Sequence, residues 1–194
     1  NVARFSSFFE IPDDLDTEPE NLAAEDKWIL AEFSSMLRTV LSAWQELDIY
    51  SATQALKNFG TGIFPSHWME MAKSRLYDCD SSATWTVHRI VRDFMSAFSP
   101  VCPFFTHHIT ETLYHHSAVD VRQFPDQPVA ELVVGSDENI RLCGLTQSII
   151  EFNSSTWKQK KDSGISLNMP ITGVEMPLEL QEFSAILGQM HKLE

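Results

Sequence analysis

Two groups of residues in this sequence have the types and the spacing to carry chemistry. The first is a mixture of cations and aromatic rings in the middle of the chain: Trp68, Lys73, Arg75, Tyr77, Arg89 and Arg92. Cations hold phosphates and aromatic rings stack on unpaired bases, so this mixture indicates a surface that binds RNA. The alternative is an ordinary solvated helix face with Trp68 in the core.

The second group lies on a predicted helix that begins at Pro103. His108, Glu111 and His115 are spaced by three and four residues, so they share one helical face. Imidazole and carboxylate groups on one face are able to ligate zinc or iron. A histidine near a helix C-terminus is also stabilised by the helix dipole without a metal, and a metal site in a bundle needs acidic partners on facing helices. We therefore expect no metal site here.

The signatures of nucleotide-binding loops and of nucleophilic hydrolases are absent. The sequence contains no G-x-G-x-x-G, no G-x-x-x-x-G-K-[ST] and no G-x-S-x-G, and its seven glycines are scattered. A phosphate-binding loop and a nucleophile turn both depend on those glycines. We therefore assign no catalytic residue to this chain.

Length and composition favour one folded domain with a small appendage. Of the 194 residues, 43% are hydrophobic and 11% aromatic, which is enough to fill a core and excludes a disordered chain. No apolar run approaches the roughly 20 residues of a membrane span, so we expect no membrane association. Cys79, Cys102 and Cys143 form no C-x-x-C pair, which favours the reducing cytoplasm over a disulfide framework or a zinc ribbon.

The charge is strongly negative and unevenly distributed. A net charge of −13 argues against unspecific binding to nucleic acid or to an anionic membrane. Residues 1–56 hold three basic and eleven acidic side chains, whereas residues 57–97, which contain the cations and aromatic rings, hold five and four. A further basic cluster of Lys158, Lys160 and Lys161 ends a predicted helix; it either complements the helix dipole or contacts phosphate.

Apolar periodicity predicts one long helix over Asp26–Leu47, with Asp26 as its N-cap. The buried face of this helix should hold five large side chains: Trp28, Phe33, Leu37, Val40 and Trp44. A second helical pattern, over residues 52–76, is interrupted by two glycines and Pro65, which fits either two helices or one kinked helix. The acidic segment 10–26 should be a surface loop.

The rest of the chain also has a mainly helical pattern. In chain order it predicts helices over residues 81–98, 103–116 and 137–161, with a connector over 117–128, then a short strand over 171–176 and a last helix over 178–190. The inward face of the 103–116 helix should hold Phe105, Ile109 and Leu113. The pattern predicts an all-α fold, an up-and-down helical bundle over residues 1–168 with a strand-helix tail over residues 169–194.

Several segments, taken in order, resemble the helical anticodon-binding domain of class I aminoacyl-tRNA synthetases. The similar segments are residues 1–5 (N-A-x-R-F in the family), 26–30 (D-[RK]-W-I-L), 50–59 (Y-x-x-x-x-A-L-x-x-F), 68–77 ([WY]-[LI]-E-x-x-K-x-R-[LV]-Y), 99–106 (A-P-F-x-P-F-x-T), 117–125 (S-V-x-x-x-[WF]-P) and 160–168 (K-x-x-x-G-[LI]-S-L-N). The last of these favours the valyl branch. The glycines and Pro65 depart from the family, which usually keeps that helix regular.

The resemblance implies that this chain recognises the unpaired anticodon bases of a valine tRNA by stacking and edge contacts, while basic side chains hold the phosphates. On that basis we predict five RNA contacts: Arg4, Lys73 and Arg75 to the backbone, and Trp68 and Tyr77 as stacking rings. The catalytic signatures H-I-G-H and K-M-S-K-S are absent. Amino-acid activation with ATP and Mg²⁺ is therefore expected of the catalytic domain of a longer parent chain, and no cofactor is expected here.

Several alternatives remain open from the residues alone. The chain lacks an initiator methionine and ends in Leu193-Glu194, a pair typical of a cloning junction, so we expect a piece of a longer protein. The parent could be an isoleucyl, leucyl or methionyl relative, and the bundle itself could instead bind a metal or another protein. We expect a cytoplasmic monomer whose partners are valine tRNA and the parent's catalytic domain.

Overall fold

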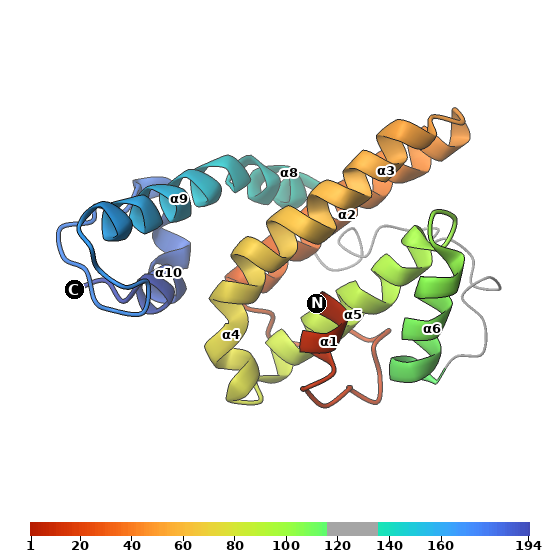
Figure 1. Cartoon of the computed structure of the whole chain (residues 1–194), viewed down its shortest axis with the longest axis horizontal. Helices are drawn as coiled ribbons and strands as arrows, with labels where there is room; N and C mark the ends of the chain where they lie inside the picture. The colour runs from red at the N-terminus through yellow and green to blue at the C-terminus, as the bar shows by residue number, and fades with distance from the viewer. Residues whose placement is uncertain (116–135) are drawn as a thin grey trace.

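The computed structural model describes residues 1–115 and 136–194, which fold into a bundle of helices (Figure 1). The elements in chain order are α1 (Val2–Ser6), α2 (Ala24–Gln45), α3 (Ile49–Asn58), η1 (Phe59–Trp68), α4 (Met69–Tyr77), α5 (Ser81–Phe98), α6 (Pro103–Tyr114), α8 (Ser136–Gly144), α9 (Thr146–Asp162), η3 (Leu178–Phe183) and α10 (Ser184–His191). The predicted all-α bundle is confirmed. The predicted connector over 117–128 and the motif residues Ser117, Val119 and Phe124 lie outside the described residues.

The long helix α2 packs against α3, α5 and α8. Trp28, Phe33, Leu37 and Val40 are buried as predicted, whereas Trp44 is only half-buried. The N-cap position is Ala23, so the prediction of Asp26 as the cap is wrong. Asp26 lies in the first turn of the helix, where its side chain points into the protein instead of toward the free backbone N–H groups.

The interrupted pattern between residues 49 and 77 forms one continuous helix with a widened centre. The elements α3, η1 and α4 follow each other without a break, and η1 is a π-helix that contains Pro65. Proline has no N–H and its ring clashes with the carbonyl four residues earlier, so the regular α-helical ladder is interrupted there. A Cβ on Gly60 would lie 2.7 Å from the Phe94 ring, so glycine allows η1 to pack closely on α5.

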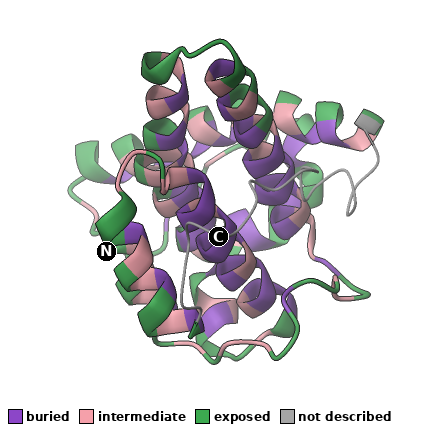
Figure 2. Cartoon of the chain, turned by 90° about the vertical axis from the view of Figure 1, so that its right-hand side faces the viewer, coloured by how far each residue is buried: buried purple, intermediate pink, exposed green. Residues whose placement is uncertain are grey.

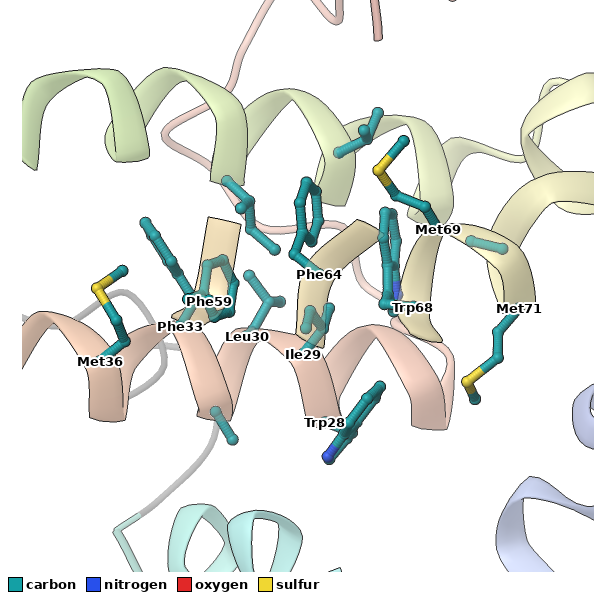
Figure 3. Packing of buried hydrophobic residues seen from close by; sticks show 14 of the residues in the cluster. Trp28, Ile29, Leu30, Phe33, Met36, Phe59, Phe64, Trp68, Met69 and Met71 are labelled. Carbon is teal, nitrogen blue, oxygen red and sulfur yellow. The ribbon is translucent and has the colours of Figure 1, made fainter. Parts of the chain in front are cut away.

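The centre of the core is a row of aromatic rings from α2 and η1 (Figure 3). The rings of Phe33 and Phe59 have centroids 5.3 Å apart, and Phe59 stacks on Phe64 at 5.6 Å. Phe64 in turn stacks on Trp68 at 5.2 Å with nearly parallel planes. The π-helix therefore places three aromatic side chains on its inner side, against α2.

Helix α6 is rotated relative to the prediction. Its buried residues are Thr106, Thr110 and Tyr114, whereas Phe105 is exposed and Ile109 and Leu113 are only partly buried. The predicted inward face is therefore wrong. Two of these buried side chains find partners: the Tyr114 hydroxyl donates to the carbonyl of His88 on α5 at 3.2 Å, and the Thr106 hydroxyl donates to the carbonyl of Pro103 in its own helix at 3.1 Å. The Thr110 hydroxyl is buried without a partner in the described ranges.

The C-terminal part also differs from its prediction. The expected single helix over 137–161 is broken between α8 and α9 at Leu145, next to Gly144. The expected strand over 171–176 does not form, because Ile171 pairs only in an isolated parallel bridge with Leu193 within the described ranges. The last helix begins as the 3₁₀ turn η3 and continues as α10. The division of the chain at residue 168 stays a prediction, and the described tail contributes buried side chains to the same core.

A buried chain of hydrogen bonds connects η1, α9 and α10. The Asn153 amide nitrogen donates to Nδ1 of His67 at 3.0 Å, and its oxygen accepts from Nε2 of His191 at 2.7 Å. This arrangement needs His67 in its neutral form, and Nδ1 of His191 is buried without a partner in the described ranges. Burial, together with the nearby charge of Lys160, lowers the pKa of His191 to about 4.

This cluster predicts a loss of stability in acid. A histidine in the unfolded chain has a pKa of about 6.5, so the contribution of neutral His191 is complete above that pH and is lost as the pH falls toward about 4. We expect His191→Gln to reduce the loss of unfolding free energy between pH 7 and pH 5 by about 2 kcal/mol, measured by urea titration. The exposed His108→Gln is the matched control and should leave the pH dependence unchanged. Equal pH profiles for the wild type and His191→Gln would contradict this prediction.

No helix within the described ranges combines the length and the apolar composition that are needed to cross a bilayer.

Candidate nucleic-acid interface

Of the five predicted RNA contacts, Trp68 lies in the core. Its side chain has no exposed surface, its ring stacks on Phe64, and its Nε1 donates to Oδ1 of Asp26 at 3.0 Å. The prediction that Trp68 stacks on a base is therefore wrong, because a fully buried ring offers no face to a ligand. The alternative of Trp68 as a core residue is correct.

Arg75 is a structural residue and not a free cation. Its guanidinium contacts Oε1 of Glu25 at 2.6 Å and Oδ1 of Asp80 at 2.6 Å. It also forms a two-pronged contact with Asp26, through NH1 to Oδ1 at 3.1 Å and NH2 to Oδ2 at 2.7 Å. Burial alone would lower the pKa of Arg75, but the hydrogen bond and charges of these carboxylates raise it overall. The predicted contact of Arg75 with the RNA backbone is replaced by this role.

These contacts form a buried network that joins three helices. Asp26 comes from α2, Arg75 from α4, and Ser82 of α5 donates to Asp26 while it accepts from the backbone N–H of Ala23. Burial and the neighbouring Asp26 raise the pKa of Glu25, against the attraction of Arg75. The network connects the segments 26–30 and 68–77, a contact that periodicity alone did not reveal.

Arg89 and Arg92, the other cations of the first group, are also paired. Both bond the carboxylate of Asp93, Arg89 at 2.7 Å and Arg92 at 2.9 Å. Arg92 also reaches Asp16 at 2.8 Å, and Arg89 donates to the carbonyl of Leu15 at 2.7 Å. These arginines therefore hold the acidic N-terminal segment on α5.

Three of the predicted contacts remain at the surface. Tyr77, at the end of α4, is 61% exposed, and its ring meets the rings of Phe5 and Phe9 edge to face. Arg4 is exposed and directly precedes Phe5. Lys73 lies one turn before Tyr77 and forms a loose, exposed pair with Glu70 at 3.4 Å. These ring contacts bring α1 and the end of α4 together. Figure 2 shows that exposed residues lie on the outer sides of the helices.

Tyr77 also lines a cavity of about 720 Å³ between residues 8–19, the end of α4 and the start of α5. Its walls combine aromatic rings with acidic side chains: Phe8, Phe9, Tyr77, Trp85, Glu10, Asp13, Asp14 and Glu18. The side chain of Thr17 and the backbone N–H groups of Thr17 and Asp16 bond Asp14 and lower its pKa. Burial raises the pKa of Glu18. The cavity is in the size range of small-ligand sites. The sequence pattern indicates only a surface loop over residues 10–26, because a cavity is formed by segments that meet on folding.

The structure also shows where the second group and the second basic cluster lie. His108, Glu111 and His115 are all exposed, and within residues 1–115 and 136–194 no three metal-binding side chains gather. In the basic cluster, Lys158 and Lys161 are exposed, but Lys160 is fully buried and donates to the carbonyls of Leu167 and Met169. Lys160 is therefore excluded as a phosphate contact, whereas Lys158 and Lys161 are not.

Comparison with known families places these features in context. Residues 26–175 match the family described as the anticodon-binding domain of tRNA ligase. The chain belongs to this family. The matched range begins at Asp26 and covers the cavity residues of α4 and α5, whereas Glu25 and the cavity residues 8–19 precede it.

Similar curated proteins are archaeal valine–tRNA ligases. The domain is 32% identical to that of Saccharolobus solfataricus over 160 residues, which is 80% of this chain and 18% of the relative. It is 30% identical to that of Aeropyrum pernix and 28% identical to that of Pyrobaculum aerophilum, in both cases over nearly the whole chain and 24% of the relative. The domain therefore spans about a fifth to a quarter of the length of the relatives that it matches.

Proposed function

We propose that this domain binds the anticodon stem-loop of a valine tRNA within a valine–tRNA ligase, and that the cavity beside Tyr77 receives an unpaired base. The cavity carries this proposal because it combines the three features that base recognition needs. It has an exposed aromatic ring for stacking, hydrogen-bond acceptors for base edges, and a volume of about 720 Å³.

The acidic lining favours a base over a phosphate. Carboxylates such as Glu10 and Asp13 repel a phosphate, but they accept hydrogen bonds from the amino groups of bases, as carboxylates do from cytosine N4. Phosphates are instead expected outside the cavity, at Arg4 and Lys73, which are both exposed. This division of roles reconciles RNA binding with a net charge of −13.

The identity of the tRNA and of the parent chain rests on the relatives. The similar proteins are named valine–tRNA ligases, which favours valine over isoleucine, leucine or methionine. We propose that a catalytic part of the parent uses ATP and Mg²⁺ to activate the amino acid, and that this domain contributes tRNA binding without a cofactor. We further propose that the domain works as a monomer in the cytoplasm.

Tyr77→Ala tests the stacking role. We expect weak binding of the wild-type chain to a valine tRNA transcript, with a preference over a transcript whose anticodon is changed. Because stacking on an aromatic ring is worth about 1–3 kcal/mol per base, Tyr77→Ala should weaken binding by about tenfold and reduce that preference, whereas Tyr77→Phe should keep both. Filter binding or fluorescence anisotropy at low salt measures the affinities.

The matched control is Tyr50→Ala. Tyr50 is an exposed tyrosine on α3 that lies outside the cavity, so its loss should not change the affinity. Equal effects of the two alanine variants would exclude a specific role for Tyr77. A wild-type chain that binds both transcripts equally well, or neither, would overturn the proposed anticodon recognition.

A further inference from the structure

A second surface depression lies at the C-terminal end of α9, formed by the end of the helix and the loop that follows it. It has a volume of about 550 Å³ and is lined by Trp157, Lys158, Lys161, Ile165, Ser166 and Leu167. In Figure 1 this end of α9 lies on the opposite side of the molecule from α6. None of these residues lines the acidic cavity beside Tyr77, so the two surfaces are separate.

The loop of this depression is held in a defined conformation. Gly164 has a φ of +66°, the left-handed geometry that ends many helices. The N–H of Ile165 bonds the carbonyl of Lys160 at 2.8 Å, and that of Gly164 bonds the carbonyl of Lys161 at 3.0 Å. The buried ammonium of Lys160 then ties down the far side of the loop, through the carbonyls of Leu167 at 2.8 Å and Met169 at 2.7 Å.

The aromatic wall is also fixed in position. The ring of Trp157 lies against His67, with ring centroids 5.9 Å apart, and against His191, at 5.6 Å. These contacts hold the indole at the edge of the depression, where it is half-buried. The ring and the loop are both held in place, so they form a preorganised surface that loses little conformational entropy when a ligand binds.

The charge of this surface is opposite in sign to the net charge of the protein. Lys158 and Lys161 are exposed and three residues apart on α9, so they lie on the same side of the helix. Neither lysine forms an ion pair with the residues that the structure describes. Burial, and the like charge of Lys192, lower the pKa of Lys160, which shows that further positive charge is close. Asp162 follows Lys161 but is not part of the lining.

We propose that this depression binds the phosphate backbone of the tRNA outside the anticodon loop, with Lys158 and Lys161 on the phosphates and Trp157 with Leu167 against the adjoining sugar or base. The inference rests on the proposed function. Two unpaired cations in an otherwise acidic protein are complementary to a polyanion, and the apolar walls suit a nucleoside next to it. Backbone contacts position a nucleic acid without reading its sequence.

Lys158→Gln combined with Lys161→Gln tests the proposal in the full chain. We expect the double variant to bind the valine tRNA transcript about tenfold more weakly at low salt, and the log–log salt dependence to become shallower by roughly 1.5 to 2 units, because two phosphate contacts are lost. The affinity for the transcript with a changed anticodon should fall by the same factor. Lys158→Arg with Lys161→Arg should retain binding.

The control is Lys57→Gln, which removes an exposed lysine that lines another groove beside α1 and α6; it should bind like the wild type. Hydroxyl-radical footprinting gives a second readout, in which the wild type protects nucleotides outside the anticodon loop and the double glutamine variant does not. If the wild type prefers the matched anticodon but the double variant binds equally well and gives the same footprint, this inference is wrong while the proposed function stands. If the wild type binds neither transcript, both fail.

Discussion

Replacing Asp26 by alanine is expected to lower the free energy of unfolding by about 3–5 kcal/mol, the range for removing one partner of a buried ion pair. The side chain of Asp26 is fully buried and receives hydrogen bonds from Arg75, Trp68 and Ser82. Its removal leaves the indole N–H of Trp68 and the hydroxyl of Ser82 without an acceptor. It also leaves the Arg75 guanidinium with less negative charge to offset its burial. These costs add to the loss of the contact between α2, α4 and α5.

Glu70→Ala is the matched control for this prediction. It also removes one carboxylate that pairs with a cation of α4, but the Glu70–Lys73 pair is exposed and loose at 3.4 Å. Exposed pairs contribute little, so the expected change is below about 0.5 kcal/mol. Urea or thermal unfolding measures both variants. An Asp26→Ala protein as stable as Glu70→Ala would show that the network does not hold the helices together.

Trp28→Ala is expected to cost about 3–5 kcal/mol, the range for truncating a large aromatic side chain in a core. Trp28 has no exposed surface, and its Nε1 donates to the Thr146 hydroxyl at 2.8 Å. The substitution therefore leaves a cavity between α2 and the start of α9 and also removes a hydrogen bond between these two helices.

Trp44 provides an internal comparison on the same helix. It is half-buried, and its Nε1 has no hydrogen-bond partner in the described ranges. Trp44→Ala should cost less than Trp28→Ala, about 1–2 kcal/mol, because less surface is buried and no hydrogen bond is lost. Chemical denaturation of both variants tests the order. If Trp44→Ala proved the more destabilising of the two, the positions of these residues relative to the core would be wrong.

The family motifs in this chain serve the fold more than the ligand. Asp26, Trp68 and Arg75 each belong to a motif that resembles the synthetases, and all three meet in one buried network. Residues that touch RNA are expected at the exposed positions between them, such as Lys73 and Tyr77. A motif match therefore identifies the family of this domain, but it does not by itself locate the RNA.

Much of the architecture follows from the sequence. The stripe of Trp28, Phe33, Leu37 and Val40 repeats with the period of a helix, and burying that stripe dominates the local free energy, so the position of α2 is predictable. The start of α6 at Pro103 is equally local, because proline fits the first turn of a helix. The order of the motifs was also enough to indicate the family, since it depends on no contact.

The tertiary structure decided which charged and aromatic side chains are exposed. Arg75 and Lys73 look alike in the sequence, yet Arg75 meets two carboxylates from the distant start of α2 and a third from Asp80, while Lys73 forms only a loose, exposed pair with Glu70 in the described ranges. Lys160 and Lys161 are neighbours, yet only Lys160 reaches the carbonyls of the loop. A pattern of residue types gives the period of a helix, whereas the partner of a charge is set by segments that only folding brings together.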